Sequence, residues 1–271
     1  MKLPLTVAFL LAAAPAQAEV VLEGRLVQGG LAFGRATVGT QLSLDGRAVR
    51  LSPDGQFVIA VGRDTPASIT LAITHPDGRS ETRAVPVAAR RFEIQHIDGL
   101  PERQVTPRPE DTARISAENA QIAAARTRDT AEALFRSGFV WPVIGPISGV
   151  YGSQRILNGQ PRAPHWGVDV AVATGTPVVA AADAIVSFLH PDMFFTGTTV
   201  LLDHGHGLQS VYSHLSEVSV AAGERVKQGQ VVGKVGATGR ATGPHLHWGV
   251  TWFDVRLDPA LLVPPMPKPG G

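Results

Sequence analysis

The sequence predicts a mainly β protein, with a small N-terminal β-sandwich, a helical linker and a C-terminal antiparallel β-sheet domain. Short β-branched runs alternate with glycine-containing turns in the first hundred residues and again after residue 139. Between these regions, a proline-rich charged stretch precedes an alanine-rich stretch that contains no glycine. The chain has 271 residues, of which 44% are hydrophobic and 17% charged. That is enough for two domains with buried cores.

Residues 1–18 have the pattern of a signal peptide. Lys2 supplies the positive charge, residues 5–14 form the apolar core, and Ala16-Gln17-Ala18 matches a small-x-small cleavage site. The alternative is an uncleaved membrane anchor, but the apolar stretch is short for a bilayer. We therefore expect an exported protein of the periplasm or cell envelope, with no membrane attachment after cleavage.

Residues 19–100 are predicted to form the small accessory sandwich. Residues 58–61 and 69–73 read as buried strands, and three Asp-Gly pairs, a local hairpin signal, stand between candidate strands: Asp45-Gly46, Asp54-Gly55 and Asp77-Gly78. His75 and His96 are interpreted as packing or surface residues, because no polar cluster accompanies them.

Residues 101–138 are predicted to be a linker followed by a helix. Residues 101–109 are rich in proline and charge, and residues 110–135 favour a helix. The apolar stripe of this helix is thin, so we expect it to lie across a domain surface or to bridge the two domains. A partner-binding helix is the alternative.

Residues 139–263 are predicted to form the second domain, an antiparallel sheet with tight connections. Strand-like runs occur at 178–179, 184–186, 199–202 and 231–232, and glycines follow one another at short intervals from residue 223 to 243. The remaining residues, 264–271, form a tail rich in proline and glycine, which we expect to be mobile.

Seven of the nine histidines lie between His165 and His247. In His245-Leu246-His247, a strand would point both imidazoles to one face and Leu246 into the core. His214 ends a strand-like run, residues 208–213. Imidazole and carboxylate are zinc ligands, and the absence of cysteine excludes thiolate ligands.

His165 and Asp169 can share one metal ion only if the chain bends between them. Four residues of extended chain span roughly 13 Å, which is too long for two ligands of one zinc ion. Gly167 is the residue that could allow the bend, and we expect a bent loop that enters a strand from Val168. Five candidate side chains thus compete for the three protein positions of a hydrolytic zinc.

The wider fragments resemble the lysostaphin/LytM-type zinc metalloendopeptidases. The match rests on Gly159-Gln-Pro-Arg-Ala-Pro-His165-Trp-Gly-Val-Asp169, Tyr212-Ser-His214-Leu215 and Gly236-Ala-Thr-Gly-Arg-Ala-Thr-Gly-Pro-His245-Leu-His247, in the family's order. The resemblance implies one zinc ion held by His165, Asp169 and His247, with His214 and His245 close to the zinc-bound water. It also implies hydrolysis of peptide bonds in the stem peptides or cross-links of peptidoglycan.

The chemistry expected of such a site is metal-assisted hydrolysis. Either His214 or His245 could take the water proton, pass it to the leaving amine or stabilise the oxyanion. We expect activity to fall below about pH 6, because zinc needs neutral imidazoles. Arg155 and Asn158 are candidates for lining the substrate groove. Three aromatic residues, Tyr151, Phe194 and Phe195, could be groove walls or packing residues.

Other function classes are less well supported. The net charge of +1 and the absence of a basic run argue against a nucleic-acid partner. A non-catalytic module that binds the wall or activates another hydrolase is the main alternative. A structural zinc domain is a third possibility, but a structural zinc site usually has four protein ligands, often thiolates.

The segment 203–207 is interpreted as a polar turn, and His190 is interpreted as a loop residue. The sequence does not specify the cleaved bond, self-inhibition, the oligomeric state or regulatory partners.

Overall fold

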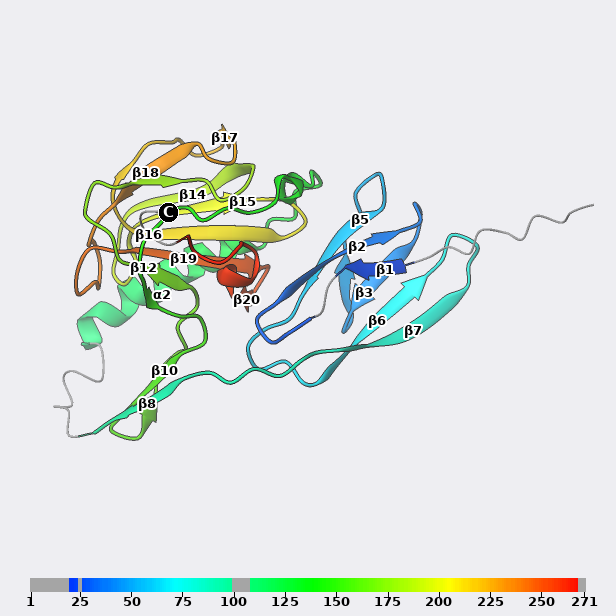
Figure 1. The fold of residues 1–271 in the computed structure, drawn as a ribbon, viewed down its shortest axis with the longest axis horizontal. Helices are drawn as coiled ribbons and strands as arrows, with labels where there is room; N and C mark the ends of the chain where they lie inside the picture. The colour runs from blue at the N-terminus through cyan, green and yellow to red at the C-terminus, as the bar shows by residue number, and fades with distance from the viewer. Residues whose placement is uncertain (1–19, 24–25, 99–107, 268–271) are drawn as a thin grey trace, which may run out of the picture.

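The computed structural model describes residues 20–23, 26–98 and 108–267, and it is mainly β, as predicted. Figure 1 shows the N-terminal strands, in blue and cyan, beside a larger sheet formed by the C-terminal half of the chain. The predicted signal peptide and most of the predicted linker lie outside the described residues. Within the described part of the chain, no helix combines the length and the apolar character needed to cross a bilayer.

The N-terminal region is built from two small sheets. One has the order β1 (Val20–Glu23), β2 (Leu31–Ala36), β5 (Gln56–Ala60); the other has the order β4 (Arg47–Val49), β3 (Gln41–Leu44), β6 (Ser68–Thr74), β7 (Ser80–Pro86). Phe57 and Ile59 of β5 and Leu71 and Ile73 of β6 are almost fully buried. Strand β6 alternates buried and exposed side chains because one face of its sheet packs on the core, whereas Phe57–Ala60 of β5 are all buried.

The Asp-Gly pairs differ in what they connect. Asp45-Gly46 joins β3 to β4 with positive φ at both residues, and Asp77-Gly78 joins β6 to β7, so these two hairpins are confirmed. The hairpin predicted at Asp54-Gly55 is wrong, because β4 and β5 belong to different sheets. There the Gly55 carbonyl accepts from the Ala36 amide, so the turn carries the chain across to the other sheet.

The predicted helix is present but shorter than expected. Helix α2 (Pro109–Arg126) ends nine residues before residue 135, and a short 3-10 helix follows at Leu134–Ser137. The hydroxyl of Thr130 donates to Asp203, and the Thr130 carbonyl accepts from the His206 amide at 2.9 Å. The Thr130 carbonyl is thus bonded to the distant turn at residues 203–206, so the chain does not continue as a helix there. Helix α2 itself packs on β14 (Ala184–Met193), as expected of a helix across a domain surface.

The C-terminal region is organised around one large sheet with the central order β17-β14-β15-β16-β19-β12-β9. Its strands are β9 (Ile147–Gly149), β12 (Val168–Val170), β13 (Pro177–Val179), β14, β15 (Gly197–Asp203), β16 (Leu208–Val218), β17 (Arg225–Val226), β18 (Val231–Val235), β19 (Leu246–Trp252) and β20 (Val255–Leu257). A 3-10 turn, Pro259–Leu261, follows. All strand pairs of this sheet are antiparallel, as predicted.

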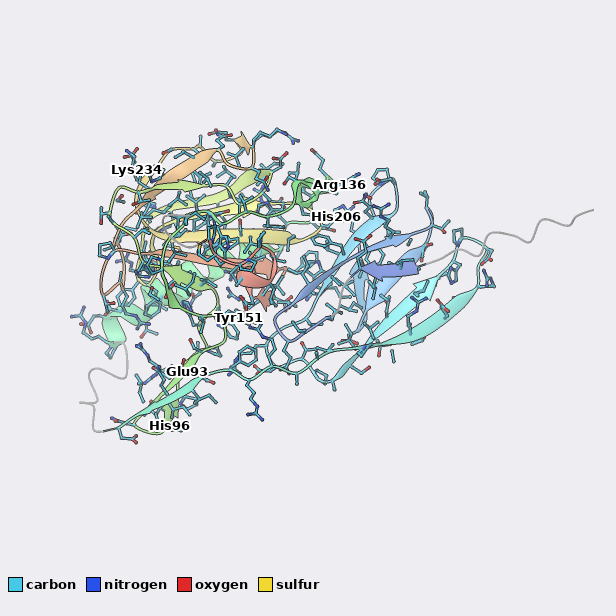
Figure 2. All side chains as sticks on the ribbon, in the orientation of Figure 1. Glu93, His96, Arg136, Tyr151, His206 and Lys234 are labelled. Carbon is cyan, nitrogen blue, oxygen red and sulfur yellow. The ribbon has the colours of Figure 1, made fainter. Side chains whose placement is uncertain are left out.

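A fourth sheet, with three strands, links the two halves of the chain. Strand β8 (Ile94–Ile97) pairs in parallel with β10 (Gln154–Leu157), which pairs with β11 (Gln160–Pro161). Figure 2 shows His96 on this three-stranded sheet, away from the large sheet. The domain limits stay predictions, but β8 is structurally tied to the segment that precedes His165.

The turn between β15 and β16 is a buried polar turn. His204 is fully buried; its Nδ1 lies 2.8 Å from the Asp183 carbonyl and its Nε2 lies 2.7 Å from the Ser210 hydroxyl. This arrangement fits a neutral imidazole that donates from Nδ1 and accepts at Nε2. Burial lowers the pKa of His204 to about 4.

We expect His204 to make stability depend on pH. In the unfolded chain its pKa returns to about 6.5, so the unfolded state binds the proton first as the pH falls. The free energy of unfolding should therefore decrease from about pH 6.5 to about pH 4. Denaturant unfolding with chelator present should show a smaller decrease for His204→Gln. Equal pH slopes for the two proteins would contradict this prediction.

Candidate metal centre

The register between β12 and β19 places two candidate ligands side by side. Asp169 is directly opposite His247 in this antiparallel pair. Their neighbours Val168, Leu246 and Trp248 point the other way and are almost fully buried. Because side chains alternate along a strand, burial of these neighbours turns Asp169 and His247 to the open face of the sheet.

His165 reaches the same point through the bend that the sequence predicted. Its Nε2 lies 3.0 Å from Asp169 Oδ1 and 3.0 Å from His247 Nδ1, and His247 Nδ1 lies 2.8 Å from Asp169 Oδ1. Ligands about 2.0–2.1 Å from a tetrahedral zinc ion are about 3.3 Å apart, so this triangle is within a few tenths of an ångström of a zinc-binding face. The three side chains therefore fit the ion in donor type and in spacing.

Backbone groups orient the His165 ring. Its Nδ1 lies 3.1 Å from the Val150 carbonyl, which fits donation from Nδ1 and leaves Nε2 to face Asp169 and His247. Gly149, just before Val150, lies so close to Asp169 that a Cβ there would come within 2.4 Å of Oδ2. Sequence reasoning missed these contacts, because a backbone carbonyl leaves no signature in the residue types.

The electrostatics of the three groups follow from their proximity. Burial works to raise the pKa of Asp169, but hydrogen bonds to His165 and His247 and the charges of the two rings outweigh it, so the pKa lies well below its usual value. Burial works to lower the pKa of His165, and the hydrogen bond to Asp169 raises it overall. Burial lowers the pKa of His247 despite the same carboxylate.

His214 and His245 lie beside this triangle. Their ring centroids are 4.6 Å apart, and His245 Nε2 lies 3.9 Å from Asp169 Oδ1. His214 Nδ1 lies 2.8 Å from the Thr238 carbonyl, and His245 Nδ1 lies 2.9 Å from the Gly243 carbonyl. Both rings can therefore donate from Nδ1 and keep Nε2 as the basic nitrogen. Burial lowers the pKa of His214 to about 4.

The backbone of His214 is held in an uncommon conformation. Its φ is +62°, which costs energy for a residue with a side chain. The His214 amide donates to the Thr196 carbonyl at 2.8 Å, and the nearby Phe194 amide donates to Glu118 of α2 at 2.7 Å. Helix α2 thus supports the loop that positions His214, a role that its sequence did not indicate.

The two predicted groove residues lie on the segment that precedes His165. Arg155 is exposed on β10, and its positive charge opposes protonation of His165. Asn158 follows in the turn, with φ +47°. Tyr151 is a packing residue: it is buried, and its hydroxyl donates to the Arg256 carbonyl at 2.9 Å. Figure 2 shows it at the junction between the sandwich and the large sheet.

The site opens to solvent with the N-terminal region in place. The side chains of His165, Asp169 and His247 are 24%, 22% and 16% exposed. In the part of the chain that the structure describes, the sandwich and α2 therefore leave these three side chains partly accessible from solvent.

Comparison with known proteins identifies the family. The model of peptidase family M23 matches residues 163–259, which contain all five candidate residues. A provisionally named peptidase M23 of Pseudomonas aeruginosa, known from its crystal structure, is 33% identical, with a TM-score of 0.69. The alignment covers 88% of this chain and 95% of that one. The chain belongs to peptidase family M23.

Curated M23 relatives match over shorter segments. The DD-carboxypeptidase/endopeptidase Mpg of Neisseria meningitidis is 39% identical over 104 residues, 38% of this chain and 24% of the relative. The peptidoglycan DD-endopeptidase ShyA of Vibrio cholerae is 43% identical over 88 residues, 32% of this chain and 20% of the relative. The chain thus spans a quarter or less of the length of these two relatives.

We expect Gly167→Ala to weaken metal binding. A Cβ at Gly167 would lie 2.4 Å from the Trp248 carbonyl oxygen and 2.8 Å from His247 Cε1, so the loop or the His247 ring must move. A shift of this kind should lower zinc affinity about 10- to 100-fold, as measured by competition with a chromogenic chelator. Gly62→Ala is the matched control, because its Cβ would meet nothing closer than 3.8 Å. Equal zinc affinity for both variants would show that the bend tolerates a side chain.

Proposed function

We propose that this protein is an exported zinc metalloendopeptidase that hydrolyses peptide bonds in the stem peptides or cross-links of peptidoglycan. One observation carries the proposal: His165, Asp169 and His247 bring three ligand atoms within 4.8 Å of one another in a member of peptidase family M23. These three residues would hold one zinc ion. The name of ShyA, a peptidoglycan DD-endopeptidase, supports a peptidoglycan substrate.

A zinc ion held by these residues would supply an activated water molecule at neutral pH and would polarise the scissile carbonyl. The chain's own contribution to proton transfer comes from His214 and His245. The Nδ1 of each ring faces a backbone carbonyl, so Nε2 can accept a proton and later give it to the leaving amine. Because burial lowers the pKa of His214 to about 4, this ring is neutral at physiological pH and its Nε2 is free of a proton.

Substitutions should separate metal ligands from proton-transfer residues. We expect His247→Ala and Asp169→Ala to lose bound zinc and to reduce digestion of purified peptidoglycan about a hundredfold or more. His214→Ala and His245→Ala should retain zinc, while their turnover falls about 10²- to 10⁴-fold. Metal analysis and release of soluble peptides measure the two effects.

The control for these variants is His96→Ala, on the exposed strand β8, which should match the parent protein. A non-catalytic wall-binding or activator module makes the opposite prediction. Its activity would survive both loss of His247 and removal of zinc by a chelator.

We also expect zinc binding to weaken as the pH falls. The pKa of Asp169 lies far below neutral pH, so this ligand stays ionised. The pKa of His165 is raised above its usual 6.5. A proton therefore competes with zinc for Nε2 once the pH falls below this raised pKa. Apparent affinity should fall about tenfold per pH unit in this range, as measured by calorimetry. A flat profile from pH 7.5 to pH 5.5 would contradict the assignment of His165 as a ligand.

A further inference from the structure

Several arginines of the fold pair with a carboxylate, whereas two arginines near the candidate metal centre do not. Arg50 pairs with Asp129 at 2.7 Å, and Arg90 pairs with Asp258 at 2.8 Å. In the described ranges, by contrast, no carboxylate forms an ion pair with Arg162 or Arg240. Both residues belong to the segments that lead into the site, Arg162 before His165 and Arg240 before His245-Leu246-His247.

Arg162 is held in place with a hydrogen-bond donor that nothing satisfies. Its amide donates to the Arg155 carbonyl at 2.9 Å, and its carbonyl accepts from Gln154 Nε2 at 2.7 Å. The guanidinium makes one long contact, from Nη2 to Gln160 at 3.3 Å. Its Nε is buried and has no partner among the described residues. An unpaired buried donor is costly, so this arrangement favours an acceptor from outside the chain.

Arg240 approaches from the other side of the site. The loop that carries it is closed by a bridge between Gly236 and His245, and Thr238 of the same loop contacts His214. The Arg240 guanidinium lies 4.3 Å from the Phe195 ring centroid, and its amide donates to the Phe195 carbonyl at 2.9 Å. Stacking on the ring leaves the edge of the guanidinium fork available to a ligand.

The two arginines are close enough to repel one another. Partial burial, followed by the positive charge of Arg162, lowers the pKa of Arg240. Two like charges that lie near one another without an acid between them repel, although solvent screens this repulsion because Arg240 is exposed. An anion bound between them would remove this repulsion and satisfy the unpaired donor.

We propose that Arg162 and Arg240 form a subsite for a free carboxylate of the peptide substrate, close to the scissile amide. The planar guanidinium fork matches a carboxylate, which it can bind through two hydrogen bonds. This inference rests on the proposed peptidoglycan peptidase function and specifies its substrate class. The preferred peptides carry a free carboxylate, and neutral peptides, such as chains of glycine, are poor substrates.

The test compares peptidoglycan with free carboxylates and the same material after conversion of those carboxylates to carboxamides. We expect the full chain to digest the amidated walls at least tenfold more slowly. Arg162→Gln and Arg240→Gln should digest the unmodified walls at least tenfold more slowly and should discriminate less between the two substrates. Arg79→Gln is the matched control: it removes the same charge from the β6–β7 turn and should behave as the parent protein.

A binding measurement keeps this inference separate from catalysis. Calorimetry with a synthetic stem tetrapeptide, in free-acid and amidated forms, should show at least tenfold tighter binding of the free acid to the full chain. Both arginine variants should lose that preference while their thermal unfolding stays that of the parent. Equal binding of the two peptides would overturn the carboxylate subsite even if the walls are digested. If the walls are not digested, the peptidase function fails, and the calorimetric preference alone decides the subsite.

Discussion

The structure of the candidate site depends on the register between β12 and β19. Asp169 faces His247 across this pair, and the residues on either side of them are core residues. A slip of one residue would bury the carboxylate and the imidazole and expose Val168 and Trp248 instead. The apolar core behind the sheet therefore fixes which face the two ligands occupy, because a one-residue slip would expose the apolar side chains. The metal-binding geometry is in this sense a consequence of packing.

The other three histidines are positioned by the backbone. Carbonyls of Val150, Thr238 and Gly243 face Nδ1 of His165, His214 and His245 respectively. These contacts set ring orientation and tautomer, and each leaves Nε2 directed toward the centre. The loops that supply the carbonyls are themselves fixed, since Gly149 and Gly167 admit no side chain without displacing Asp169 or His247. A close-packed scaffold of this kind lowers the cost of organising the site for reaction.

Features that depend on neighbouring residues could be predicted from the sequence, and features that depend on residues far apart in the chain could not. The period of two in His245-Leu246-His247 and the bend at Gly167 are local properties, and both could be read from neighbouring residues. The family resemblance added the choice among five candidates. The end of α2 at Arg126, the sheet change at Asp54-Gly55 and the pairing of β8 with β10 depend on partners far away in the chain. Local propensity carries no information about such partners.

The arginines that bind the N-terminal region to the large sheet differ in their partners from the two arginines of the proposed carboxylate subsite. Arg50 and Arg90 join the N-terminal region to Asp129 and Asp258, and Arg47 lies over the ring of Phe253 at 5.0 Å. These charges are neutralised within the fold, so their effect is to hold the sandwich against the large sheet. Arg162 and Arg240 have no such neutralisation and stand on the two segments that enter the metal centre. These two guanidinium groups lack a carboxylate partner in the described residues, so the carboxylate proposed to bind there would supply the opposite charge.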